Sequence, residues 1–387
     1  MSGVLLRLVC SAAVAAGTAL APMPAAAAPD PPAASERGAA GLLTELQRLY
    51  REAERATEAY NATEERLERQ RALAERLQAA LARTRNSLHD SRSAAGRLAR
   101  QQYQNRSDLS PYLRLLLARD AQGVLDQGQV IGRLARQRAR AVGRLTGEAQ
   151  KATELARRAR KALDTQRALT ERSRKQRDQV RERLREVEEL IASLSPEEVA
   201  AVEKLERAEA DAEQQRLVTS GALPVPGTAP APTAAGAQAV SYAVRQVGKP
   251  YQWGAEGPGT YDCSGLTSQA WEAAGTPVPR TSQEQWARLE RIPLKRLRPG
   301  DLVVYFPDAT HVALYVGDGK VVQAPRPGAR IKVSPVAGPG PVLGAVRPDP
   351  AGKPLRHYQP PELPGRAMAG PDAGRAQAPA ASATSLR

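Results

Sequence analysis

The sequence has few of the residues from which a single large hydrophobic core is built. Aromatic residues make up 4% of its 387 residues, with one phenylalanine, and there are only two cysteines. The aromatic and large aliphatic residues concentrate after residue 239, which excludes one core spanning the whole chain. Beyond the N-terminal region, no apolar run approaches the roughly 20 residues that a membrane-spanning helix needs. We therefore expect a small globular domain near the C-terminus and an extended structure before it.

The first thirty residues have the pattern of a secretory signal. Arg7 precedes an apolar run over residues 8–21, and a tract of small residues follows it. Removal of residues 1–28 also removes Cys10 and leaves Cys263 as a lone thiol in an oxidising compartment. We therefore expect a secreted protein that is released or is held at the cell surface by other means.

The chain is strongly basic, with a formal net charge of +15. Nucleic acid is the first partner to consider for such a protein. However, arginine alternates with glutamate along the expected helices, as on a solvated helical surface, and the sequence contains no recognisable nucleic-acid-binding module. An exported protein also meets the anionic polymers of a bacterial wall before it meets a genome. We therefore expect no nucleic-acid partner.

Two long segments have the repeat of a coiled coil. Over residues 42–88, apolar side chains recur at alternating steps of three and four, and only Thr63, Gln70 and Thr84 interrupt the two rows. A looser repeat covers residues 124–194. The two segments are long enough to pair along most of their length, which predicts a long antiparallel hairpin of helices.

The ends of this hairpin are marked by local signals. Pro111 and a cluster of leucines lie between the two repeats and predict a small helical cap at the tip. A further helix is expected after Ser195, which precedes a proline in the first turn. We assign residues 36–217 to an all-α coiled-coil hairpin.

The remaining chain divides by composition. Residues 218–236 are a linker rich in proline and alanine, and residues 349–387 are an expected disordered tail. Residues 237–348 contain two helical patterns and then short strand-like runs, which predicts an α+β domain with helices packed on a small antiparallel sheet. The five expected strands cover residues 301–306, 311–316, 320–324, 331–333 and 344–346.

Cys263 opens a predicted helix for which Asp262 is the expected N-cap. The helix dipole and the free backbone amides at this end should lower the pKa of the thiol and could bind an oxyanion. A lone thiol with a suitably placed histidine is sufficient for nucleophilic acyl transfer, and His311 lies in a strand-like run. A small buried core cysteine is the alternative interpretation of Cys263.

The loop after the second strand decides where Gln323 points. A two-residue turn would place Gln323 and His311 on opposite faces of the sheet, whereas a three-residue loop Gly317–Gly319 with a bulge pairs Ala313 with Gln323. In the second case the amide of Gln323 could orient the imidazole. We predict the bulged loop, with Gly319 in the left-handed conformation.

Five motifs occur in order in the C-terminal part of the chain: Lys249–Gly254, Asp262–Leu266, Pro279–Ser282, Arg298–Leu302 and His311–Gly317. With these motifs the sequence resembles the NlpC-type cell-wall cysteine peptidases, a branch of the papain-like superfamily, over residues 237–347. The hairpin is similar, less specifically, to N-terminal coiled coils of secreted wall hydrolases of actinobacteria.

The resemblance implies a role for each site residue. Cys263 would be the nucleophile, His311 the general base and acid, and Gln323 the polar residue that orients the histidine. Many family members have histidine at the position of Gln323, so this chain departs from the common pattern there. The resemblance further implies four residues near the oxyanion or the substrate: Tyr251, Asp262, Ser264 and Arg280.

The implied function is hydrolysis of peptidoglycan stem peptides, typically at the bond from D-γ-glutamyl to a diamino acid, through a thioester. The alternatives are a catalytically silent, wall-binding adaptor, or an amidase or acyltransferase on the same scaffold. The hairpin is expected either to cover the active-site groove or to dock on a membrane-embedded regulator of division or wall synthesis. No cofactor is implied, and the three histidines have no second ligand at metal-binding spacing.

Overall fold

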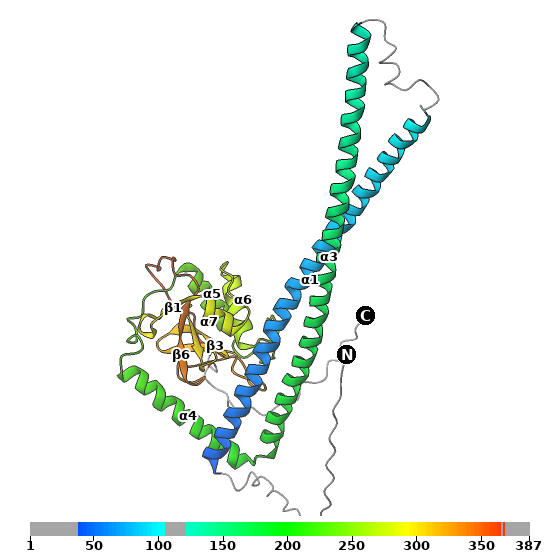
Figure 1. Ribbon diagram of the computed structural model, residues 1–387. Helices are drawn as coiled ribbons and strands as arrows, with labels where there is room; N and C mark the ends of the chain where they lie inside the picture. The colour runs from blue at the N-terminus through cyan, green and yellow to red at the C-terminus, as the bar shows by residue number, and fades with distance from the viewer. Residues whose placement is uncertain (1–37, 105–120, 365–366, 368–387) are drawn as a thin grey trace, which may run out of the picture.

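The computed structural model describes residues 38–104, 121–364 and 367. The expected signal segment and the expected cap at the hairpin tip lie outside these residues. Within them, no helix is apolar enough over a sufficient length to cross a membrane. The architecture is a long helical hairpin beside a compact α+β domain, as Figure 1 shows, so the expected fold class is confirmed.

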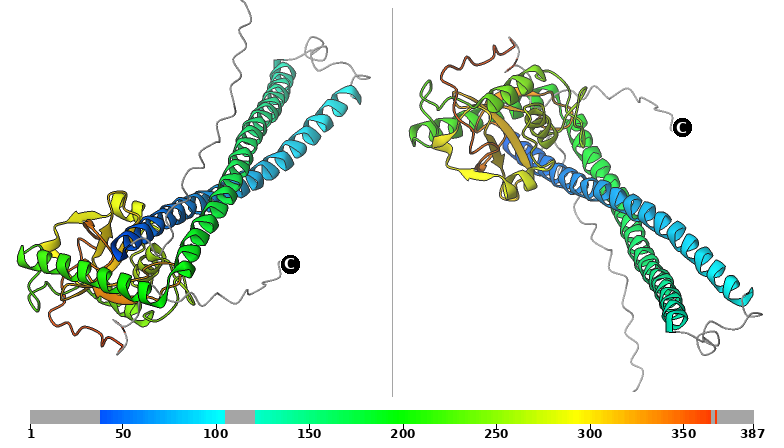
Figure 2. Two further views of the ribbon diagram at one scale, coloured as in Figure 1. Left: turned by 90° about the horizontal axis from the view of Figure 1, so that it is seen from below. Right: turned by 90° about the horizontal axis from the view of Figure 1, so that it is seen from above.

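The hairpin consists of α1 (Ala39–Gln104) and α3 (Ala121–Ser193), which run antiparallel and pack along much of their length. The polar residues that interrupt the predicted seam are accommodated there. Thr63 and Thr84 are buried, and Nε2 of Gln70 donates a hydrogen bond to the carbonyl oxygen of Ala162 at 2.9 Å. The two helices diverge toward their distal ends in all views (Figures 1 and 2).

Helix α4 (Pro196–Thr219) returns the chain from the base of the hairpin to the domain. Ser195 and Glu198 form the capping box that the sequence suggests, because the Ser195 hydroxyl accepts from the Glu198 N–H and the Glu198 carboxylate accepts from the Ser195 N–H. Near its end, Gln214 bonds to the backbone of Gly319 and Ala337. The helix is therefore fixed to the domain at its C-terminal end.

The domain has one six-stranded sheet in the order β1-β6-β2-β3-β4-β5, in which every pairing is antiparallel. The strands are β1 (Glu290–Ile292), β2 (Leu302–Tyr305), β3 (His311–Gly317), β4 (Lys320–Gln323), β5 (Lys332–Pro335) and β6 (Val342–Arg347). The helical elements of the domain are α5 (Ala234–Arg245), α6 (Cys263–Ala273), α7 (Ser282–Arg288) and the 3₁₀ helix η3 (Leu294–Arg296). The three-residue edge strand β1 was not among the expected strands.

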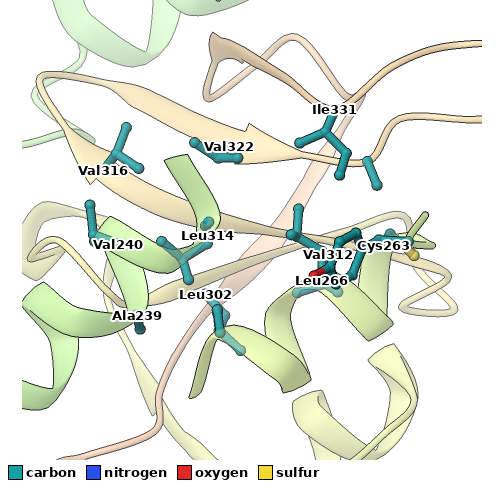
Figure 3. Packing of buried hydrophobic residues seen from close by; sticks show 14 of the residues in the cluster. Ala239, Val240, Cys263, Leu266, Leu302, Val312, Leu314, Val316, Val322 and Ile331 are labelled. Carbon is teal, nitrogen blue, oxygen red and sulfur yellow. The ribbon is translucent and has the colours of Figure 1, made fainter. Parts of the chain in front are cut away.

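Alternating residues of the strands face two apolar clusters. Helices α5 and α6 cover one face of the sheet, where Leu302, Val312 and Leu314 are buried against Leu266 (Figure 3). Cys263 lies at the edge of the same cluster, at the start of α6. The packing of α6 on the sheet therefore fixes the position of the thiol.

The β3–β4 hairpin has the predicted register but a different loop. Leu314 lies opposite Val322, the register in which Ala313 would face Gln323. The turn itself contains two residues, Asp318 and Gly319, both with positive φ, and the bulge precedes it at the irregular pairing before Gly317. The extra residue thus enters on β3 rather than in the turn, with the same effect on which face Gln323 occupies.

The segments expected to be linker and tail contact the domain at several points. Leu223 is buried among the apolar residues on the second face of the sheet. Asp349 accepts hydrogen bonds from Thr233 and Arg298, and Leu355 bonds to the backbone of Pro232. The expected disorder therefore does not include the start of the segment after residue 348.

Candidate active site

The N-terminus of α6 presents the thiol. The Asp262 carboxylate caps the helix by accepting from the Gly265 N–H at 2.6 Å, and Cys263 is the first helical residue. Gly265 has no side chain at a point where a Cβ would collide with the Ala255 carbonyl, so the preceding loop can pack closely on this turn. The backbone N–H of Val312, in β3, hydrogen-bonds to the thiol sulfur. The thiol therefore lies beside the start of the strand that carries His311.

His311 and Gln323 are joined as the sequence predicts. Nε2 of His311 lies 2.9 Å from Oε1 of Gln323, and Nε2 of Gln323 donates to the Ser334 hydroxyl at 2.6 Å. Because Gln323 accepts through its carbonyl oxygen, Nε2 of His311 carries the proton and Nδ1 remains the nitrogen free to act as a base. All three residues are buried.

Asp262, Ser264 and Arg280 form one buried polar cluster. The Arg280 guanidinium donates to both carboxylate oxygens of Asp262, at 3.1 and 2.7 Å, and to the Ser264 hydroxyl at 2.9 Å. It also pairs with Glu256 at 2.5 Å. This bidentate contact orients the guanidinium, and the carboxylates of Asp262 and Glu256 together balance its charge.

Tyr251 and the loop that follows it line the other side of the thiol. Burial, with the nearby Cys263 and carboxylates, raises the pKa of Tyr251 well above its usual value, which keeps its hydroxyl protonated as a possible hydrogen-bond donor. Gly254 has a φ of +71°, a conformation that favours glycine, and its N–H donates to Asp262 at 2.9 Å.

Helix α1 of the hairpin lies directly over this site. The Glu58 carboxylate accepts from the Ser264 hydroxyl at 2.7 Å and from the Ser282 backbone N–H at 3.1 Å, and its Oε1 is 3.8 Å from the sulfur of Cys263. Glu58 is only 2% exposed, although it belongs to the surface of the hairpin. A carboxylate from the N-terminal segment therefore occupies the space in front of the thiol.

Glu54, one helical turn earlier, faces the histidine. Its Oε1 lies 3.4 Å from Nδ1 of His311, the nitrogen that Gln323 leaves free. Its Oε2 is buried without a hydrogen-bond partner. Glu54 and Glu58, hereafter the α1 glutamate pair, thus face His311 and Cys263 at the same time, since residues four apart lie on one face of a helix.

Further contacts hold α1 in this place. Nδ2 of Asn61 donates to Asp262 at 3.0 Å, and the ring of Tyr60 meets that of Trp253 edge to face, with 5.1 Å between centroids. Arg55 pairs with Asp308 at the surface. The contact therefore extends over at least two turns of α1 on both sides of Cys263.

Arg326 joins α1 and α4 to the domain. Its guanidinium lies 4.3 Å from the ring centroid of Tyr50 in α1 and pairs with Glu206 in α4 at 3.1 Å. Beside it, a cavity of about 870 Å³ is bordered by both helices and reaches His311 and Gln323. The α1 helix thus covers the thiol side of the site, while space remains on the histidine side.

This arrangement reverses the expected effect on the thiol. Burial, followed by the charges of Glu58, Asp262 and Glu54, raises the pKa of Cys263 well above its usual value. The helix N-terminus alone would lower it. With α1 in place, Cys263 is therefore a protonated thiol and a poor nucleophile.

The structure thus brings the seven predicted site residues into one region. Sequence reasoning missed Glu54, Glu58, Tyr60 and Asn61 of α1, together with the Ser282 amide. The motif containing Ser282 was a signal for that residue. The glutamate pair had none, because glutamates four apart on a helix are common on solvated surfaces. Among the described residues, no group of three or more His, Cys, Asp or Glu side chains is arranged to hold a metal ion.

Comparison with known proteins agrees with the geometry. Residues 248–342 match the model of the NlpC/P60 family. This chain belongs to the NlpC/P60 family. It is 44% identical over 103 residues to a probable endopeptidase of Corynebacterium glutamicum, and 36% identical over 148 residues to the peptidoglycan endopeptidase RipA of Mycolicibacterium smegmatis.

These relatives match only part of this chain. The match to the Corynebacterium protein covers 26% of this chain and 49% of that protein, and the match to RipA covers 33% and 30%. The chain therefore spans about half or less of the length of these relatives. The solved NlpC/p60 domain of the peptidoglycan hydrolase SagA is 30% identical, with 29% of this chain and 97% of that chain covered and a TM-score of 0.27.

Proposed function

We propose that this protein is an exported peptidoglycan endopeptidase that cleaves a stem-peptide amide bond through Cys263 and His311, and that α1 holds it inactive. The observation that carries the proposal is the hydrogen bond between Nε2 of His311 and Gln323, which leaves Nδ1 available, while the next residue of β3, Val312, contacts the thiol at the α6 N-terminus. The family membership supports peptidase chemistry, and the N-terminal sequence pattern supports export.

The chemistry requires withdrawal of the α1 glutamate pair. Nδ1 of His311 then takes the thiol proton, and the thiolate of Cys263 attacks the amide carbonyl carbon. The backbone amides of the first turn of α6 and the Tyr251 hydroxyl are the donors placed to stabilise the oxyanion. His311 returns the proton to the leaving amine, and a water molecule, deprotonated by His311, hydrolyses the thioester.

The position of Glu58 supports an acidic substrate residue. The Ser264 hydroxyl and the Ser282 amide bind its carboxylate, and Arg280 lies next to them. A D-γ-glutamyl residue carries a free α-carboxylate close to its γ-amide bond, so it could place its negative charge in this pocket when α1 leaves. The expected cleavage site from D-γ-glutamyl to a diamino acid therefore fits this pocket.

Inhibition by α1 combines steric exclusion with charge. Glu58 fills the space where a substrate carboxylate and carbonyl would lie. The carboxylate of Glu54 lies next to His311, where the thiolate would otherwise be its anionic neighbour. The raised pKa of Cys263 keeps the nucleophile protonated. Reaction with substrate therefore depends on an event that separates α1 from the domain.

The proposal is tested by digestion of purified peptidoglycan with four full-length proteins: wild type, Glu54→Ala/Glu58→Ala, the same pair combined with Cys263→Ala, and Glu68→Ala. Glu68 is an exposed glutamate on α1 that does not reach the domain, so it serves as the matched control. We expect the glutamate-pair variant to release fragments at least about tenfold faster than wild type, since each lost bond to a charged group is worth roughly 1.5–3 kcal/mol.

Each part of the proposal can fail separately. Equal product release with and without Cys263 would exclude the thiol mechanism. Equal rates for wild type and the glutamate-pair variant would exclude inhibition by Glu54 and Glu58 while leaving the peptidase in place. Mass spectrometry of the fragments identifies the bond cleaved, and the absence of products from every variant would favour a silent wall-binding protein.

A further inference from the structure

The distal half of the hairpin has an unusual charge. We define the distal arms as residues 76–104 of α1 and 121–147 of α3. They contain eleven arginines and two acidic residues, Asp90 and Asp126, and no lysine. The rest of the two helices, residues 39–75 and 148–193, contains nineteen basic and seventeen acidic residues. The positive charge of the hairpin is therefore concentrated at the end far from the peptidase domain.

All eleven arginines of the distal arms are exposed to solvent. In the rest of the hairpin, exposed arginines pair along the helix with glutamates, as Arg157 does with Glu154 and Arg185 with Glu182. The distal arms have too few carboxylates for such pairing to neutralise them. Their surface therefore carries a dense positive field that favours an anionic partner.

Exposed apolar side chains gather on the same arms. Of the nine large apolar side chains that are exposed among the described residues, five lie there: Tyr103, Leu125, Val130, Leu134 and Val142, with 37–76% of each exposed. Leu134 lies one heptad before Ala141, which is buried, so it continues the seam of α3. The two helices diverge toward this end of the hairpin (Figures 1 and 2). The divergence thus uncovers apolar surface between the arginines.

We propose that the distal arms bind the surface of a bilayer that contains anionic phospholipids. Guanidinium groups form paired hydrogen bonds with phosphate, and apolar side chains between them can enter the boundary between headgroups and acyl chains. A soluble polyanion would use the arginines alone and would leave the exposed Leu125 and Val142 in water. The combination of both features on one surface therefore favours a lipid surface over a charged polymer.

This binding does not depend on the peptidase activity. It would determine how far the peptidase domain can lie from the lipid surface. Helix α3 passes the active site near residues 173–183, where Ser173 bonds to Glu64 and Arg183 pairs with Glu52. From Arg140 to that level is about 60 Å of continuous helix at 1.5 Å per residue. A membrane-bound distal arm would therefore hold the peptidase domain within about that distance of the lipid surface.

The test is cosedimentation of the full-length protein with vesicles of phosphatidylcholine alone or of phosphatidylcholine mixed with phosphatidylglycerol. The variant Arg133→Gln/Arg136→Gln/Arg140→Gln removes three exposed charges from the distal arm of α3. Its matched control, Arg160→Gln/Arg172→Gln/Arg174→Gln, removes three exposed charges from the same helix near the domain. We expect binding to the anionic vesicles only, at least about tenfold weaker for the distal variant and close to wild type for the control.

A second variant, Tyr103→Ser/Val142→Ser, tests the apolar part at unchanged charge. We expect it to bind more weakly to vesicles and to bind soluble polyphosphate as wild type does. Circular dichroism confirms that each variant keeps its helix content. Equal losses in both triple variants, equal binding to both vesicle types, or binding to polyphosphate without any binding to vesicles would each overturn the proposal.

Discussion

Oε1 of Glu58 lies 2.7 Å from the hydroxyl oxygen of Ser264, across 206 residues of sequence. Ser264 follows Cys263 directly, so the N-terminal hairpin contacts the proposed reacting centre and not a distant surface. The second member of the pair, Glu54, faces His311. Because both groups are carboxylates on one face of one helix, a single movement of α1 would free Cys263 and His311 together.

The reactivity of Cys263 should report the position of α1. In wild type the thiol is buried and its pKa is raised, so alkylation by iodoacetamide should be slow. In Glu54→Ala/Glu58→Ala we expect alkylation at least about tenfold faster, since the charges that disfavour the thiolate are gone. Peptide mapping by mass spectrometry at timed intervals measures the rate at this residue, and Glu68→Ala should behave as wild type. Unchanged protection in the pair variant would contradict the assignment.

Docking of α1 should weaken as the pH rises from about 4.5 to 7. Burial, followed by the charge of Asp262, raises the pKa of Glu58 from 4.5 to about 7, while Ser264, Arg280 and the Ser282 amide oppose the shift. The docked state therefore binds a proton more tightly than the undocked state. Its extra stability is fully present below pH 4.5 and is lost as the pH passes through 7.

The variant Glu58→Gln provides the control for this pH dependence, because an amide does not titrate. Hydrogen exchange of the segment containing the Ser282 N–H measures docking in both proteins at each pH. We expect the ratio of exchange rates, wild type over Glu58→Gln, to increase between pH 5 and 7, since the ratio cancels the intrinsic pH dependence of exchange. A constant or falling ratio would show that Glu58 is not the titrating group.

Gln323 should act by orienting His311. Its replacement by alanine leaves Nε2 of His311 without its acceptor and removes the link to Ser334. In the active Glu54→Ala/Glu58→Ala background, we expect Gln323→Ala to lower kcat roughly 100-fold on a synthetic stem peptide, the lower end of the range for general acid and base catalysis. Gln323→His, which can still bond to Nε2, should retain most of the activity. A loss confined to KM would place Gln323 in substrate binding instead.

Arg326 should help to hold the hairpin against the domain. Substitution by methionine keeps much of the side-chain length but removes the contact with the Tyr50 ring and the pair with Glu206. Since a desolvated cation over an aromatic ring is worth about 2 kcal/mol, we expect peptidoglycan digestion roughly 30-fold faster than wild type. Arg330→Met is the matched control, because Arg330 is exposed in the same loop and bonds only to the Gly248 carbonyl among the contacts described. Equal rates for the two variants would argue against a role of Arg326 in docking.

Local chemistry made much of the domain predictable. The N-cap at Asp262, the cap at Ser195 and the face of Gln323 each follow from a few neighbouring residues, and the structure confirms them. The loop between β3 and β4 was only half predicted. The requirement that Gln323 and His311 share a face of the sheet predicts how many residues are inserted, and this number sets the register. It does not predict whether the extra residue lies in the turn or in β3, because Gly317 and Gly319 permit the backbone geometry of both.

The contact between the hairpin and the active site could not be derived in the same way. The heptad pattern determines which face of α1 packs against α3. It does not determine what packs against the face of α1 on which Glu54 and Glu58 lie. The pKa of Cys263 is raised, and not lowered as expected, for the same reason. The helix dipole is a local effect, whereas the two glutamates and much of the burial come from a segment some 200 residues away in the chain. The short strand β1 pairs with β6 alone, so its existence also depends on tertiary contact.

The linkage through α4 has a consequence for how the proposed inhibition would end. Because α4 follows α3 after a break at residues 194–195 and is fixed to Gly319 and Ala337 at its far end, a displaced α1 stays on the same molecule as the site that it covered. A tethered segment of this kind returns at an effective concentration on the order of millimolar, which dilution does not change. Activity would therefore persist only while something keeps the helix away, and the enzyme would close again without any new synthesis or repair.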